Sequence, residues 1–216
     1  MSDAEALKRA AAVAAAEEVR DGMVLGLGTG STVAHLLPAI AVRGLRDLRC
    51  VATSVATAQQ AASLGITVEP FDAVERLDLA IDGADQIAPD GWIVKGGGGA
   101  HVREKIVAAA ADRFVVIADT SKVVDKLSAP IPLELLEYGL PATLARLTPC
   151  DLRPGMPPSP DGNLIADYAG PVGDPAALAA LLSATPGVVD HGLFPPALTA
   201  EIIIASTAGL ERRTLR

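Results

Sequence analysis

The sequence predicts an α/β fold: a Rossmann-like parallel sheet with helices on both faces, and a smaller α+β domain inserted before the last strand. Between residues 23 and 119, short apolar segments alternate with helix-like segments, as in the βαβ units of a parallel sheet. The apolar segments are nearly continuous, which is typical of strands covered by helices on both faces. Only 3% of the 216 residues are aromatic, so the core must consist of aliphatic side chains.

The elements of the larger domain follow one another in a regular order. A helix is predicted over residues 2–20, because Ser2 and Glu5 have the spacing of a capping box and Gly22 is a stop signal. Five strands are predicted, at residues 23–28, 48–54, 66–70, 77–82 and 113–119. Helices are predicted between them, at residues 31–43, at residues 56–65 and from the glycine run to about residue 111.

The regular alternation ends near residue 129, where three prolines occur within a short stretch. The next segments predict a strand, a helix, a weak strand, a strand, a helix and a short strand, which together make a small α+β domain. Residues 200–207 form a last buried strand that is expected to return to the first sheet. We therefore expect one domain of residues 1–129 plus about 200–216, and a second of about 130–199.

Composition and charge restrict the classes of partner and the location that are expected for the protein. The formal net charge of −8 and the isoelectric point near 4.8 argue against a nucleic-acid partner, which requires a basic face. Cys50 and Cys150 show no metal-ligand spacing, and reduced thiols are expected. The N-terminus does not resemble a signal peptide, and no stretch reaches the roughly 18 apolar residues of a membrane span. We therefore expect a cytoplasmic protein.

The residues that follow the predicted strands are candidates for a site, because ligands of an open parallel sheet bind beyond the carboxyl ends of its strands. These residues are mostly small, hydroxyl-bearing or charged. They are Gly28 to Thr32, Thr53 and Ser54, Asp82 to Asp85, Lys95 with its glycines, and Asp119 to Lys122.

The turn at residues 28–32 combines bare backbone and hydroxyl groups at the start of a helix, which suits a phosphate group. It lacks the Gly-Lys-Ser/Thr ending of a P-loop, and its glycine spacing differs from that of a dinucleotide-binding turn. A tight strand-to-helix turn without any ligand explains the same residues.

Asp82 and Asp85 place two carboxylates at the end of a predicted strand. A turn or a helix cap explains them, and so does a metal ion. Because no His or Cys lies nearby in the sequence, a metal would depend on these carboxylates alone, and none is predicted.

The four glycines at residues 96–99 cost more folding entropy than an ordinary loop. Glycine lets the backbone approach a ligand closely and direct N–H groups at a developing oxyanion. Lys95 adds a positive charge before the glycines, and Glu104 falls early in the next helix, where it can serve as a base. The alternative is a flexible loop beside a solvated helix face.

The three histidines, His35, His101 and His191, are too scattered to indicate a Ser-His-Asp or Cys-His set. His101 is the closest of them to the candidate site. We expect it on the surface of its helix.

Four motifs, GLGTGST, DGAD, KGGGGAHVREK and ADTSK, closely resemble in order and spacing those of type A ribose-5-phosphate isomerases. The resemblance is dense over residues 23–126 and thinner at residues 161–167 and 186–194. His101 stands where the family more often has an apolar residue. Residues 134–160 look shortened and divergent, which affects the expected contacts of the small domain.

The resemblance implies roles for individual residues. Glu104 would transfer the proton, Lys95 would stabilise the oxyanion, and Asp82 would open the sugar ring and move protons between oxygens. The implied substrate contacts are Thr29, Gly30, Ser31, Thr32, Asp82, Gly83, Ala84, Asp85, Lys95, Gly96, Gly97, Gly98, Lys122 and, on the first helix, Lys8. No metal and no other cofactor is implied.

The implied activity is the interconversion of D-ribose 5-phosphate and D-ribulose 5-phosphate through an enediol(ate), in the non-oxidative pentose phosphate pathway. The expected partner is a small sugar phosphate, with no nucleic acid and no membrane. A homodimer or homotetramer is implied by the family alone.

Two other classes remain open. A sugar-phosphate sensor of a transcription regulator would need a DNA-binding domain before the sheet, but the first strand is predicted already at residue 23. An amino-sugar-phosphate deaminase or a coenzyme A transferase shares the fold group. The deaminase is expected to use a histidine for ring opening, and no histidine here is well placed for that. Turnover separates the isomerase from the sensor.

Overall fold

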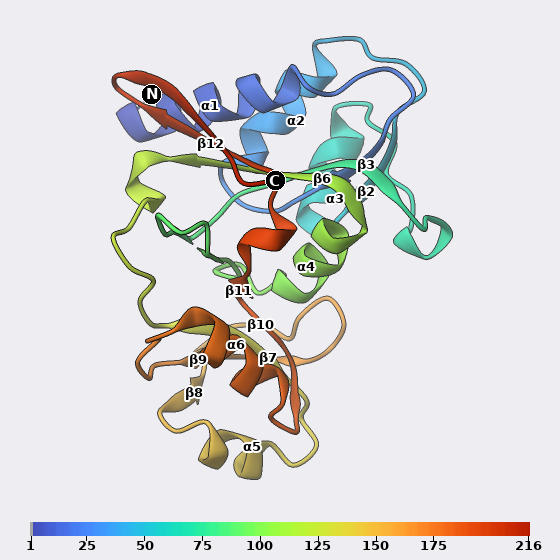
Figure 1. Ribbon diagram of the computed structural model, residues 1–216. Helices are drawn as coiled ribbons and strands as arrows, with labels where there is room; N and C mark the ends of the chain where they lie inside the picture. Colours follow the sequence, from blue (N-terminus) through green and yellow to red (C-terminus); the bar gives the residue numbers. More distant parts are fainter. Residues whose placement is uncertain (1) are drawn as a thin grey trace. The chain divides into compact units, whose positions relative to one another are not determined.

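The computed structural model describes residues 2–216, and the chain divides into two compact units (Figure 1). Unit 1 contains the chain up to Ala84, Arg103–Val123 and Pro196–Arg216. Unit 2 contains Asp85–Val102 and Val124–Pro195. These boundaries differ from the expected ones mainly at residues 85–102, which the sequence placed with the larger domain.

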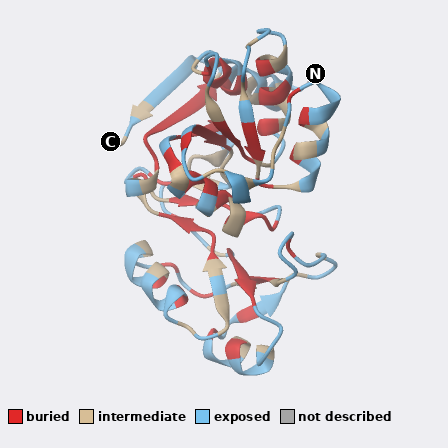
Figure 2. Ribbon diagram, turned by 90° about the vertical axis from the view of Figure 1, so that its right-hand side faces the viewer, coloured by how far each residue is buried: buried red, intermediate tan, exposed pale blue. Residues whose placement is uncertain are grey.

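Unit 1 is built on a six-stranded sheet with the order β13-β12-β6-β3-β1-β2. The strands are β1 (Val24–Leu27), β2 (Arg49–Ala52), β3 (Leu77–Asp82), β6 (Ala111–Asp119), β12 (Glu201–Ser206) and β13 (Gly209–Thr214). All pairings are parallel except that of β13 with β12. Figure 2 shows the inner strands as buried, which explains their unbroken apolar sequences.

Helices cover both faces of this sheet, as the sequence predicted. They are α1 (Asp3–Ala16), α2 (Val33–Ala41), α3 (Val55–Ser63) and α4 (His101–Ala110). On one face, α1 and α2 pack on side chains that include Leu25 and Leu27. Gly26 points to the opposite face because side chains alternate along a strand. A Cβ atom on Gly26 would lie 2.5 Å from Cγ1 of Val107, so this glycine lets α4 pack closely against the sheet.

The first helix is shorter than predicted and ends at Ala16 rather than near residue 20. Its end is fixed by a residue distant in sequence. The guanidinium group of Arg43 donates hydrogen bonds to the carbonyl oxygens of Ala16 and Val19. These bonds satisfy carbonyl groups that another turn of helix would otherwise have satisfied.

The strand predicted at residues 66–70 is wrong. This segment makes only an isolated parallel bridge, between Val68 and Cys50. Pro70 has no N–H group with which to extend the pairing. The last strand, β13, was not predicted, because its exposed and charged residues lack an apolar pattern.

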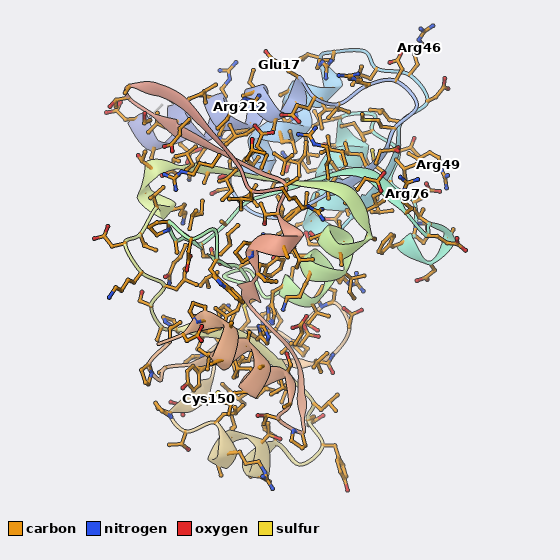
Figure 3. The ribbon with its side chains drawn as sticks, in the orientation of Figure 1. Glu17, Arg46, Arg49, Arg76, Cys150 and Arg212 are labelled. Carbon is orange, nitrogen blue, oxygen red and sulfur yellow. The ribbon has the colours of Figure 1, made fainter. Side chains whose placement is uncertain are left out.

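Four charged side chains connect β6, β12 and β13 with the chain just after α1. Arg212 and Arg113 each pair with both Glu18 and Glu201, at N–O distances of 2.6 to 3.0 Å. Arg212 is labelled in Figure 3. The alternating charges form a network that ties the final strand of the chain to its first helical segment.

Unit 2 contains two small antiparallel sheets. The first has the order β10-β7-β9-β8, and the second has the order β11-β5-β4. Their strands are β4 (Gln86–Ile87), β5 (Ile93–Val94), β7 (Ile131–Leu135), β8 (Cys150–Leu152), β9 (Leu164–Tyr168), β10 (Val188–His191) and β11 (Leu193–Phe194). The helices of the unit are α5 (Leu140–Arg146) and α6 (Pro175–Ser183). The predicted succession of elements after residue 130 is confirmed. Residues 85–102 belong to unit 2 because β5 pairs with β11.

Both cysteines are free and buried. Burial raises the pKa of each thiol, Cys50 and Cys150, to about 11, so both are protonated near neutral pH. Among the described residues, no helix is long and apolar enough to cross a membrane.

Candidate active site

The carboxyl group of Asp82 is held by the turn that follows β1. Asp82 ends β3 and is only 2% exposed. Its Oδ1 atom accepts hydrogen bonds from the N–H groups of Thr29, at 3.0 Å, and Gly83, at 2.7 Å. A Cβ atom on Gly28 would lie 2.0 Å from the carboxyl carbon of Asp82. Gly28 was among the residues that follow the predicted strands but was assigned no role, and the structure shows that it is required for this close approach.

A cluster of hydroxyl groups fixes the same turn. The Oγ1 atom of Thr29 lies 2.8 Å from that of Thr53 and 3.1 Å from that of Thr57. Thr57 in turn donates to the carbonyl oxygen of Gly28. The hydroxyl group of Thr29 is therefore engaged with neighbouring side chains, and its backbone N–H is engaged with Asp82.

The N–H groups at the start of α2 are available to a ligand. Gly30 and Ser31 are exposed, and Gly30 has a φ of +116°, which favours glycine. Within residues 2–216, no protein group accepts a hydrogen bond from the backbone N–H of Gly30, Ser31 or Thr32. Such N–H groups at a helix start suit a phosphate group.

Lys8 belongs to a short chain of polar side chains between α1 and α2. Its Nζ atom lies 2.8 Å from Oε1 of Glu5, and Oε2 of Glu5 lies 2.8 Å from Nε2 of His35. The hydrogen bonds from Lys8 and His35 hold the pKa of Glu5 below its ordinary value. The hydroxyl group of Ser2 accepts from the Glu5 N–H, as expected of a helix cap. The two oxygens of the Glu5 carboxylate are thus bonded to Lys8 and to His35.

Two further predicted residues lie in unit 1. Glu104 is in the first turn of α4, near the positive end of the helix, and is only 5% exposed. Lys122 ends the short 3-10 helix η2 (Thr120–Lys122) that follows β6, and it is partly buried. Asp119 caps this helix by accepting the Ser121 N–H at 2.8 Å.

Lys95 is positioned by a segment near the end of unit 2. Lys95 follows β5 and is 3% exposed, and its Nζ atom lies 5.7 Å from the centre of the Phe194 ring. Its N–H donates to the carbonyl oxygen of Gly192 at 2.9 Å. A Cβ atom on Gly192 would lie 2.1 Å from the Lys95 carbonyl oxygen. Sequence reasoning assigned no role to Gly192 or Phe194, although both lie in a stretch that resembles the family.

The glycine run is held by specific contacts and is not a free loop. The carboxylate of Asp85 accepts the Gly97 N–H at 2.7 Å. Gly96 has a φ of +104°, and a Cβ atom there would lie 2.7 Å from Nδ1 of His101. His101 was expected on the helix surface, but it is completely buried. The absence of a side chain at Gly96 makes room for its ring.

Some of the predicted site residues thus belong to unit 1 and the others to unit 2. Unit 1 contributes Lys8, Thr29 to Thr32, Asp82 to Ala84, Glu104 and Lys122. Unit 2 contributes Asp85, Lys95 and the glycines. Within residues 2–216, no group of three or more His, Cys, Asp or Glu side chains could hold a metal ion.

Comparison with known proteins identifies the family. The family described as ribose 5-phosphate isomerase A (phosphoriboisomerase A) matches residues 49–209. The chain belongs to this family. A ribose-5-phosphate isomerase A of Caulobacter vibrioides is 47% identical over an alignment that covers 95% of this chain and 96% of that protein. The corresponding protein of Halobacterium salinarum is 46% identical, with 88% of both chains covered.

Solved structures of ribose-5-phosphate isomerases agree with this assignment. The crystal structure of the Neisseria gonorrhoeae ribose 5-phosphate isomerase A has a TM-score of 0.94 at 32% identity, covering 100% of this chain and 99% of that one. A D-ribose-5-phosphate isomerase in complex with phospho-erythronic acid has a TM-score of 0.92 at 31% identity, covering 99% and 100%. The stretch that looked divergent, residues 134–160, lies inside the region that matches the ribose 5-phosphate isomerase A family.

Proposed function

We propose that the protein interconverts D-ribose 5-phosphate and D-ribulose 5-phosphate in the non-oxidative pentose phosphate pathway. Family membership carries this proposal. A related isomerase is known in complex with phospho-erythronic acid, a four-carbon phosphate whose carboxylate resembles a planar enediolate. The groups described above supply what aldose–ketose isomerisation requires.

Proton transfer between C2 and C1 of the open-chain sugar needs a base. Glu104 is the proposed base, because its carboxylate is almost fully buried in the first turn of α4. It would remove the proton from one carbon and return it to the other. General acid–base catalysis of this kind contributes about 10²- to 10⁴-fold in typical enzymes.

The oxygen that gains negative charge in the enediolate needs positive partners. Lys95 and the backbone N–H groups of the glycine run are the proposed partners, since hydrogen-bond donors aimed at a developing oxyanion lower the barrier. Asp82, held by Thr29 and Gly83, is proposed to open the ring and to move protons between O1 and O2. Lys8, Lys122 and the turn at residues 29–32 are proposed to bind the phosphate end.

We expect wild-type turnover to be unchanged by EDTA, because the proposed mechanism uses only protein groups. Ribulose 5-phosphate formation should be measured after exhaustive treatment with EDTA and again after divalent metals are added back. Loss of activity with EDTA that a metal restores would contradict the metal-free mechanism. Binding of ribose 5-phosphate without any turnover would favour the sensor instead.

Replacing Gly97 with Val should reduce kcat by at least about 10²-fold in a folded protein, the cost typical of losing an oxyanion donor. The Asp85 carboxylate accepts the Gly97 N–H, and a Cβ atom would lie 2.9 Å from Asp85 Oδ1. The bulky side chain should therefore displace the backbone of the run. Steady-state kinetics and circular dichroism test this, and full activity would contradict the proposed role of the glycines.

The assembly and location of the protein are also proposals. By resemblance to the family, we propose a homodimer or homotetramer in the cytoplasm. Light scattering in solution tests the assembly, and a monomeric mass at micromolar concentration would contradict it.

A further inference from the structure

Arg153 makes an unusual set of contacts to the glycine run. It follows β8 in unit 2, and its Nη1 atom donates to the carbonyl oxygens of Gly96, at 3.1 Å, and Gly97, at 2.9 Å. The other side of the guanidinium group binds both carboxylate oxygens of Asp167, at 2.8 and 2.6 Å. One side chain therefore joins two consecutive peptide groups of the run to the sheet of unit 2.

Asp167 anchors the guanidinium group on the sheet side. Asp167 lies on β9, where its backbone is opposite that of Asp151 on the neighbouring strand β8. The pair of Arg153 and Asp167 is bidentate and mostly buried, with the side chains 18% and 25% exposed. Bidentate charge-assisted pairs are strong and fix the plane of the guanidinium group. The hydrogen bonds with Asp167 also raise the pKa of Arg153.

These contacts determine which way the N–H groups point. In a trans peptide, the C=O and N–H bonds point in opposite directions. The peptide between Gly96 and Gly97 is held at both ends, by Arg153 at its oxygen and by Asp85 at its N–H. The next peptide is held by Arg153 at the Gly97 oxygen, so the Gly98 N–H points away from the guanidinium group.

The Gly98 N–H is consequently an available donor with a fixed direction. Gly98 is exposed, and within the described residues no protein group accepts its N–H. Without Arg153, glycine peptides could rotate and lose this direction, because glycine has the widest range of backbone conformations. A fixed donor is more effective than a mobile one, because it needs no reorganisation as charge develops.

We propose that Arg153, held by Asp167, is a positioning residue for isomerisation that orients the Gly98 N–H toward the developing oxyanion of the enediolate. This inference rests on the proposed isomerase function and on the oxyanion role of the glycine run. Arg153 touches no reacting atom in this scheme. It acts through the two carbonyl groups that it binds.

The test replaces Arg153 with Met and, separately, Asp167 with Asn. We expect Arg153→Met to lower kcat by at least about 10-fold with KM changed by less than about 3-fold, a smaller loss than deletion of a whole donor. Binding of phospho-erythronic acid should weaken by a factor similar to the loss in kcat/KM. Inhibition by inorganic phosphate should be unchanged. Asp167→Asn should show the same pattern to a smaller extent.

Glu134→Gln serves as the matched control. Glu134 is 1% exposed, and its Oε1 atom accepts hydrogen bonds from Ser159 and Asn163, at 2.7 Å each. It therefore anchors the loop that begins at Arg153 without binding the glycine run. We expect this variant to lower the thermal midpoint but to keep kcat and the affinity for phospho-erythronic acid within about 2-fold of the wild type.

Three results would overturn the proposal. One is a kcat within about 2-fold of the wild type for Arg153→Met. Another is an equal loss of affinity for inorganic phosphate and phospho-erythronic acid. The third is a matching loss of kcat in Glu134→Gln, which would make the effect structural. If Arg153→Met does not fold, Arg153→Lys and Asp167→Asn decide by the same criteria. A wild type without turnover would instead refute the proposed function.

Discussion

Replacing Glu104 with Gln is expected to reduce kcat/KM by at least about 10²-fold, with the fold unchanged. Glutamine has nearly the same shape as glutamate, but its amide cannot accept a proton from carbon. Glu104 is only 5% exposed, so a water molecule would not easily take its place. Ribulose 5-phosphate formation and exchange of the C2 proton with deuterated water should decline together.

Glu17→Gln is a suitable control for this experiment. Glu17 is exposed just after α1 and is labelled in Figure 3. The change from carboxylate to amide is the same, but Glu17 lies outside the proposed site. The activity of the Glu17→Gln variant should therefore stay within about 2-fold of the wild type. If Glu104→Gln retained activity in that range while folded, another group would have to be the base.

Replacing Gly28 with Ala is expected to have the second largest effect. The added Cβ atom would lie 2.0 Å from the carboxyl carbon of Asp82, a distance that real structures do not tolerate. The backbone of Gly28 is fixed by a hydrogen bond to Ile81, at 2.9 Å, so the Asp82 carboxylate must move. We expect kcat to fall by at least about 10²-fold and stability to fall by about 1–3 kcal/mol, typical of overpacking.

The variant Gly22→Ala separates the expected loss of activity from the expected loss of stability. Gly22 has a φ of +76° and no atom within 4 Å of an added Cβ, so the variant should lose about 1 kcal/mol through backbone strain alone. Kinetics and urea unfolding of both variants should show a stability loss in each, but an activity loss only in Gly28→Ala. Normal activity in a folded Gly28→Ala variant would show that Asp82 need not be held in this position.

The sequence predicted elements best where the pattern was long and regular. β1, β3 and β6 were predicted closely because buried parallel strands read as continuous apolar runs. The segment at residues 66–70 is shorter and mixes apolar with polar residues, and Pro70 and a short neighbouring strand limit it to one bridge. β13 lies at an exposed edge and carries no such pattern.

The candidate site was predictable to the extent that its residues form local motifs. Asp82, Lys95 and Glu104 stand in short stretches whose spacing is recognisable along the chain. The contacts that hold them in place were missed, because these contacts cross large sequence distances. Gly28 makes room for Asp82, Phe194 faces Lys95, and Arg153 reaches the glycine run from more than fifty residues away. No local sequence pattern predicts such contacts.

The placement of β12 beside β6 has a consequence for protein synthesis. Residues 201–206 supply the partner of β6, and residues 209–214 supply the outer strand. On the ribosome, the edge of β6 that β12 covers therefore stays open until residues 201–206 have been translated. All residues of unit 2 have been synthesised by residue 195, before the main sheet can be completed. Unit 2, which interrupts unit 1 along the chain, is thus the first unit whose residues are all available for folding.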